Sequence, residues 1–140
     1  MIQKILVIGQ APPKQFQKVP YDTTMIYSWL QEVDVTKDEA QEIFDWEAVY
    51  DKFPGYDKGA HAVPTPEEME YYWEMTLRDK VIDSRKIWVL GSTARQFLEN
   101  KEEMKDKYVI YTIHPSTRNK RLYNKVKADL LHDLKMFINN

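Results

Sequence analysis

The chain has 140 residues, a formal net charge of −2 at pH 7 and no cysteine. The lack of cysteine excludes disulfide bonds, thiolate zinc sites, cysteine-ligated iron–sulfur clusters and cysteine nucleophiles. The length fits one domain over residues 1–140, because a chain of this size buries a sufficient core on its own. The first residues lack a signal-peptide pattern and no apolar run reaches the ~18 residues of a membrane span, so we expect a cytoplasmic protein.

Apolar and β-branched runs predict the strands of a buried sheet. Residues 2–8, 86–90 and 107–113 are rich in isoleucine, valine and aromatic side chains, which is typical of parallel strands covered on both faces. A weaker fourth strand is predicted within residues 44–50. Residues 51–64 contain glycine, proline and aromatic residues without periodicity, so we expect an ordered surface loop there.

Helical patterns fill the intervals between these strands. Short helices are predicted over residues 23–30 and 36–44, where Thr23 and Thr36 are placed to cap the first turn. A last helix is predicted over residues 122–138, because its apolar residues recur at helical spacing on one face.

Two further helices have recognisable starts. Thr65, Pro66 and Glu68 supply a cap, a proline at the first helical position and a glutamate that completes a capping box. Ser92 is placed to cap a helix that runs to residue 100.

The alternation of strands and helices predicts an α/β fold. We expect a three-layer sandwich, with a mostly parallel central sheet of about four strands and helices on both faces. Right-handed crossovers bring the carboxyl ends of parallel strands to one edge, where open α/β proteins bind ligands. The dipeptides expected to meet at this edge are Gly9-Gln10, Gly91-Ser92 and His114-Pro115. For the proline-rich exit of the first strand, a plain tight turn remains the alternative.

Charge is unevenly distributed along the chain. The stretch HPSTRNKRLYNKVK, residues 114–127, contains five lysines and arginines and no acid, whereas residues 32–51 are strongly acidic. Such a basic stretch predicts contact with an anion such as a phosphate backbone. A solvated helix start would explain the same pattern without any binding role.

Three short motifs follow the predicted strands in order. They read GQAPP at residues 9–13, LGSTA at 90–94 and HPS at 114–116. In this order they resemble the uracil-DNA glycosylase superfamily, in which motifs of the type GQDPY or GEAPG, LGATA and HPS occupy the corresponding places. The resemblance covers nearly the whole chain and includes VPYDTTMIYSWL from residue 19 and PTPEE from residue 64.

The resemblance implies an enzyme that flips a deaminated base out of DNA and hydrolyses its N-glycosidic bond, with uracil as the expected base. It implies catalysis by His114 as a donor to the departing base, together with Gln10, and a base pocket lined by Gly9, Gln10 and Ala11. Tyr21, or else Phe16, would stack on the flipped base. The residues implied to hold DNA phosphates are Ser92, Ser116, Arg118 and Arg121. We expect a monomer without cofactor or metal.

The chain also differs from the superfamily patterns. Gln10 and Ala11 stand where one pattern has a glutamate and the other an aspartate to position the attacking water. Pro13 replaces the tyrosine that excludes the thymine methyl group. The asparagine that reads uracil in many relatives has no evident counterpart, and Asp45 and Glu47 are the polar residues nearby.

Other classes of function explain less of the sequence. A catalytically weak or inactive relative that binds DNA or a nucleobase would account for the missing carboxylate. A generic nucleotide-binding α/β domain fits poorly, because GQAPP lacks a glycine-rich phosphate cradle. Metal-dependent hydrolysis fits poorly too, since His61, His114 and His132 do not show ligand spacing with carboxylates.

Overall fold

A four-stranded sheet forms the centre of the molecule. The structure is a computed structural model that describes residues 4–11, 23–57, 60–115 and 120–140. The sheet has the order β2-β1-β5-β6 and every neighbouring pair is parallel. Its strands are β1 (Ile5–Gly9), β2 (Phe44–Ala48), β5 (Lys86–Leu90) and β6 (Tyr108–Thr112). The predicted α/β fold with a parallel sheet of about four strands is therefore confirmed.

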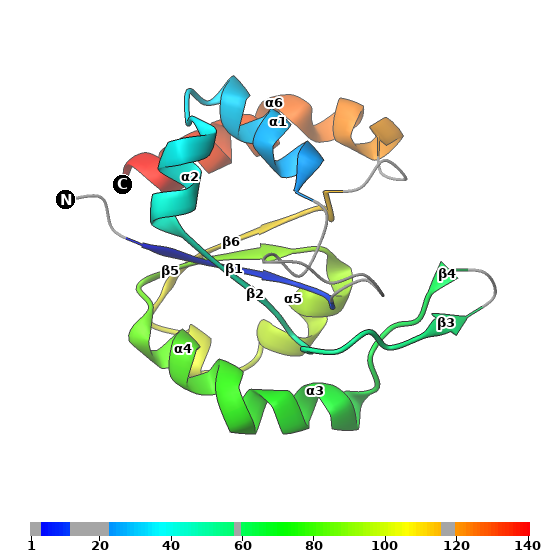
Figure 1. The fold of residues 1–140 in the computed structure, drawn as a ribbon. Helices are drawn as coiled ribbons and strands as arrows, with labels where there is room; N and C mark the ends of the chain where they lie inside the picture. The colour runs from blue at the N-terminus through cyan, green and yellow to red at the C-terminus, as the bar shows by residue number, and fades with distance from the viewer. Residues whose placement is uncertain (1–3, 12–22, 58–59, 116–119) are drawn as a thin grey trace.

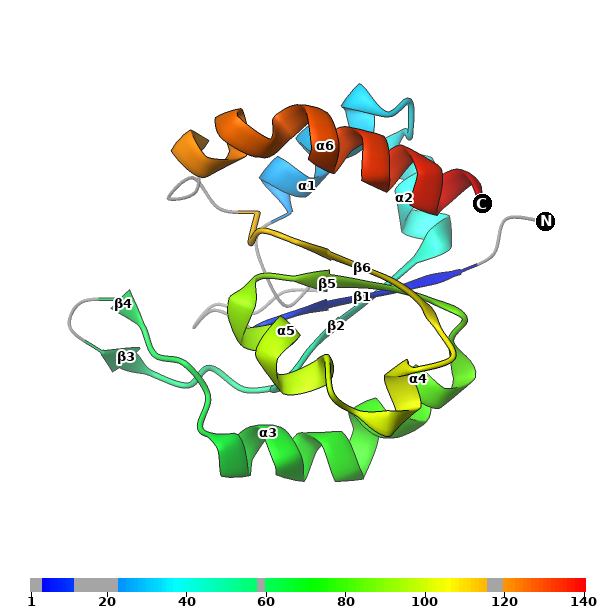
Figure 2. The ribbon, with the colours of Figure 1, turned by 180° about the vertical axis from the view of Figure 1, so that it is seen from behind.

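Helices cover both faces of this sheet (Figures 1 and 2). One layer contains α1 (Thr24–Glu32), α2 (Lys37–Ile43) and α6 (Lys120–Asn139). The other contains α3 (Pro66–Tyr72), the π-helical turn η1 (Trp73–Leu77), α4 (Arg78–Asp83), α5 (Ser92–Leu98) and the short 3₁₀ turn η2 (Glu102–Met104). The predicted three-layer sandwich is thus present. Among the described residues, no helix is both long and apolar enough to cross a membrane.

Alternation along the strands divides the core into two clusters. Ile5 and Val7 of β1 pack with the layer of α1, α2 and α6, which supplies Trp29, Leu134 and Phe137. The alternate side chains of β1, Leu6 and Ile8, pack with the layer of α3 to α5. Because successive strand residues point to opposite faces, each strand serves both layers.

The helix starts match the sequence in part. Thr36 and Thr65 each form a full capping box with the glutamate three residues later. Thr23 precedes α1 as expected, but its side chain makes no capping hydrogen bond. The expectation for Ser92 was wrong, because Gly91 occupies the cap position and Ser92 is the first helical residue.

The segment 51–64 is not simply a loop. It contains a small antiparallel hairpin of β3 (Tyr56–Asp57) and β4 (Ala60–His61), which projects from the body in Figures 1 and 2. Gly55 enters the hairpin with a φ of 95°, and its carbonyl accepts a hydrogen bond of 2.8 Å from the Ala62 backbone. Two-residue strands lack the length at which alternation becomes visible in a sequence, so this hairpin has no periodic signal.

Candidate active site

The predicted motifs meet at the carboxyl edge of the sheet. The register pairs Ile8 with Val89 and Leu90 with Thr112, so β1, β5 and β6 end side by side. Gln10 follows β1 directly, Gly91 follows β5 directly and His114 lies two residues beyond β6. The expectation that these strand ends share one edge is confirmed.

Gly91 and His114 lie in close contact. A Cβ atom added to Gly91 would lie 3.1 Å from the His114 Cβ and 3.3 Å from its Cδ2. Gly91 also has a φ of 87°, which L side chains rarely adopt. The second motif therefore needs glycine at this position, both for its backbone conformation and for the approach of the histidine. Gly91 was expected at this edge from its place after a buried strand, but its close contact with His114 was not predicted.

Hydrogen bonds hold the strand end that carries His114. The Gly91 backbone N–H donates to the Thr112 carbonyl at 2.9 Å. The indole Nε1 of buried Trp88 donates to the Thr112 hydroxyl at 2.9 Å, and that hydroxyl donates to the Ile113 carbonyl at 3.2 Å. The backbone immediately before His114 is thus tied to β5 by main-chain and side-chain bonds.

His114 is half-buried, and its protonation follows from that environment. Burial lowers the pKa of His114 from its ordinary value near 6.5, because desolvation disfavours the charged imidazolium. The imidazole is therefore neutral at pH 7. A neutral ring carries one N–H, so it can donate only one hydrogen bond at a time.

Comparison with known protein families identifies the family of this chain. The family model for the uracil DNA glycosylase superfamily matches residues 3–135, which is nearly the whole chain. The chain belongs to the uracil DNA glycosylase superfamily. It is therefore a DNA glycosylase-like protein. A comparison with curated proteins finds no match.

The first motif of this uracil DNA glycosylase relative continues the same edge. Gly9 is the last, buried residue of β1, and Gln10 and Ala11 beyond it are half-buried. The Gly9 carbonyl accepts a hydrogen bond of 2.9 Å from the Val49 backbone. The register places Ala48 beside Gly9, so β2 ends here in a methyl group and carries no amide side chain next to the first motif.

Asp45 and Glu47 do not supply the missing polar group at this edge. Glu47 points into the α3–α4 layer, where it accepts a hydrogen bond of 2.8 Å from the Tyr72 hydroxyl and pairs with Lys80. Asp45 lies nearer the start of β2 and lines a cavity with Lys4 and Lys80. Both carboxylates therefore lie away from the strand ends that form the candidate site.

Only some of the remaining predicted site residues lie in the part of the chain that the structure describes. Ser92 is exposed at the start of α5, and Arg121 is exposed in the first turn of α6. Both helices follow strands that end at the candidate edge. The residues that lie outside the described part of the chain are Tyr21, Phe16, Ser116 and Arg118.

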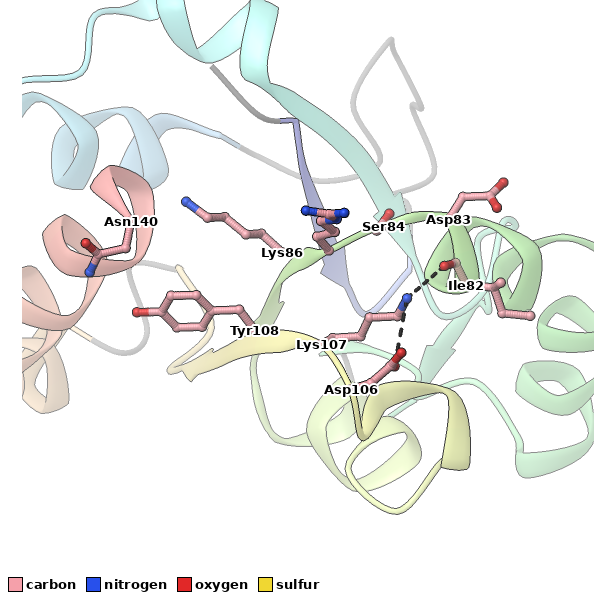
Figure 3. A pocket seen from close by; sticks show the side chains of 9 residues that line it. Ile82, Asp83, Ser84, Lys86, Asp106, Lys107, Tyr108 and Asn140 are labelled. Atoms are coloured by element: carbon pink, nitrogen blue, oxygen red, sulfur yellow. Dashed lines mark hydrogen bonds and ion pairs between the residues drawn. The ribbon is translucent and has the colours of Figure 1, made fainter. Parts of the chain in front are cut away.

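A cavity at the opposite edge of the sheet is lined by lysines that are bonded to the backbone (Figure 3). It measures about 560 Å³ and lies at the amino ends of β5 and β6. The Lys107 amine donates to the Ile82 carbonyl at 2.7 Å, and the buried Lys86 amine donates to the Phe137 carbonyl at 2.8 Å. Because both amines are bonded to backbone carbonyls near helix ends, they are less available to a ligand than the exposed side chain of Arg121.

Proposed function

We propose that the protein is a DNA glycosylase that flips a deaminated base out of DNA and hydrolyses its N-glycosidic bond. Uracil is the proposed main substrate. The observation that carries the proposal is the contact between Gly91 and His114 at the strand ends, in a chain of this superfamily. This contact supports the proposal because it joins two motifs at the edge that open α/β proteins use for ligands.

In the proposed reaction the bond between the sugar carbon and the base nitrogen breaks. The electron pair leaves with the base, and water adds to the sugar carbon and loses a proton to solvent. Negative charge therefore develops on the base oxygens, while positive charge develops on the sugar. A hydrogen bond from His114 to a base oxygen is stronger in this transition state than in the substrate, and such donors contribute ~10²–10³-fold.

The first motif has a narrower role in this proposal. Gln10 and the backbone at Gly9 and Ala11 line the pocket, and the Gln10 amide reads the polar edge of the base. Neither Gln10 nor Ala11 can deprotonate water, and general-base help is typically worth ~10²–10⁴-fold. The proposed enzyme is therefore slow, and it depends on His114 for most of its rate enhancement.

Further contacts hold the DNA around the flipped nucleotide. We assign phosphate contacts to Ser92 and Arg121, which are exposed at helix starts beside the candidate edge. The same role is proposed for Ser116 and Arg118 from their places in the third motif. Tyr21 is proposed to stack on the extruded base, with Phe16 as the alternative.

The direct test is a substrate panel. Oligonucleotides that contain uracil, hypoxanthine or a T·G mismatch are incubated with the protein and then cleaved with alkali at abasic sites. We expect cleavage at uracil, and we expect His114→Ala to abolish it. His132→Ala is the matched control, because His132 is exposed on α6, away from the strand ends. Excision that survives His114→Ala would refute the proposed role of this histidine.

A gain-of-function variant tests whether the missing carboxylate limits the excision rate. Ala11→Asp restores the aspartate of the GQDPY pattern next to half-buried Gln10. We expect it to raise the single-turnover excision rate, by up to ~10²-fold if the new carboxylate reaches the attacking water. Ala11→Asn, which adds a side chain of the same shape without a base, should give no increase. Equal rates for the two variants would show that general-base catalysis is not what this site lacks.

The absence of a carboxylate at both motif positions also supports a second candidate, a superfamily member that binds DNA or a nucleobase without cleaving it. Wild-type protein that binds DNA tightly but releases no free base from any substrate of the panel would favour this candidate.

A further inference from the structure

Charge differs between the two faces of the sheet at the candidate edge. On one face, Arg121 and Lys125 lie one turn apart on α6, and both are exposed. Within the described part of the chain, neither cation pairs with a carboxylate, whereas Arg78, Arg95 and Lys101 all do. Residues four apart share one face of a helix, so these two charges point the same way.

The other face presents carboxylates at the same edge. A cavity of about 470 Å³ lies between the chain that follows β2 and the helical segment formed by α3 and η1. Asp51, Glu67 and Glu68 line it together with Lys52. The backbone hydrogen bond with Thr65 lowers the pKa of Glu68, so this carboxylate stays charged near neutral pH. Three carboxylates against one lysine give the cavity walls a net negative charge, which disfavours a nearby phosphate.

The candidate site lies between these two surfaces. Figures 1 and 2 show α6 beginning above the carboxyl end of β6, and α3 beginning on the opposite face of the sheet. A duplex that presents a base to this edge carries a phosphate backbone on each side of the groove from which the base leaves. A single strand carries one backbone, which the cations of α6 can hold together with the hydroxyl of Ser92.

We propose that the substrate is single-stranded DNA, whose backbone runs along Arg121 and Lys125, and that the carboxylates beside α3 oppose the second strand of a duplex. This inference rests on the proposed glycosylase function, because it takes the strand-end edge as the place that holds the base. It adds Lys125 as a phosphate contact, and it assigns Asp51 and Glu67 a role in selecting the strand state.

Fluorescence anisotropy with an undamaged labelled oligonucleotide, alone or annealed to its complement, tests the proposal without turnover. Wild-type protein should bind the single strand several-fold more tightly. The double variant Arg121→Ala/Lys125→Ala should reduce the salt slope for the single strand by about 1.4, since each phosphate contact contributes about 0.7. Lys135→Ala, which removes an exposed charge near the far end of α6, is the matched control and should leave that slope unchanged.

The carboxylates are tested separately. Asp51→Asn/Glu67→Gln should raise the affinity for the duplex and leave that for the single strand nearly unchanged. Equal gains for both forms, or wild-type binding that favours the duplex, would overturn the inference.

An excision assay on both DNA forms distinguishes the strand preference from the glycosylase function. Equal excision of uracil from single strands and duplexes would overturn the strand preference and leave the glycosylase function in place. Single-strand binding with the expected salt slope, but without excision of any base, would overturn the glycosylase function alone.

Discussion

Gly91 joins two motifs of the candidate site, and its substitution tests that connection at the scale of one residue. Its φ of 87° and ψ of 168° fall in a region that is essentially restricted to glycine. A methyl group there would also meet His114 at 3.1 Å. We expect Gly91→Ala to lower the free energy of unfolding by about 1–3 kcal/mol and to displace His114, which reduces excision more than stability alone explains. Urea unfolding and single-turnover excision measure the two effects.

Gly55→Ala is the control that separates strain from contact. Gly55 has a φ of 95°, but a Cβ added to it would meet nothing within 4 Å. This variant should lose stability through backbone strain and keep its excision rate. Equal losses of activity in the two variants would contradict the positioning role of Gly91.

The protonation of His114 gives a second prediction at this scale. Burial lowers the pKa of His114 below its unfolded value near 6.5, so folding favours the neutral imidazole. The stability that this group contributes is present above pH 6.5 and is lost as the pH falls through 6.5 toward the folded-state pKa. NMR titration of the His114 imidazole should therefore give a midpoint below 6.5. A midpoint at or above 6.5 would show that the ring is not desolvated as described.

At the scale of elements, Glu47 connects β2 to the helical layer of α3, η1 and α4. It binds the Tyr72 hydroxyl before the π turn and Lys80 after it. Burial and the hydrogen bond with Glu47 raise the pKa of Tyr72. We expect Glu47→Ala to cost about 1–3 kcal/mol in urea unfolding, because it leaves the half-buried Tyr72 hydroxyl unpaired. Glu70→Ala removes a more exposed partner of Lys101 and should cost less than 1 kcal/mol.

A second substitution of Glu47 bears on catalysis. Because Glu47 faces the helical layer rather than the strand ends, Glu47→Gln should keep its excision rate wherever the protein remains folded. A loss of excision without a loss of stability would instead make Glu47 part of the active site.

Elements with local chemical signals were predictable from the sequence, whereas those that depend on tertiary contact were not. The capping boxes of Thr36 and Thr65 need only neighbouring residues, and the buried strands have long apolar runs. The π turn follows Tyr72 in a sequence that reads as one continuous helix, since the layer it packs against decides its geometry. The meeting of Gly91 and His114 at one edge was predictable from the alternation of strands and helices. Their close contact joins residues far apart in the chain and depends on tertiary packing, which no local pattern shows.

At the scale of the whole molecule, the fold places the described chemistry at one edge. The strand order puts β1 between β2 and β5, so the first motif has Ala48 on one side and the end of β5 on the other. The opposite edge holds the cavity of Figure 3, whose lysines are bonded to backbone carbonyls. We therefore propose that the edge of Gln10 and His114 holds the base.

A crystal structure of the protein soaked with free uracil tests where the base binds. We expect the pyrimidine ring to lie against Gln10 and Ala11, with a carbonyl oxygen of the base within hydrogen-bond distance of a His114 nitrogen. Uracil bound in the cavity of Figure 3, or in the cavity between Tyr50 and Met75, with the strand-end edge empty, would contradict it.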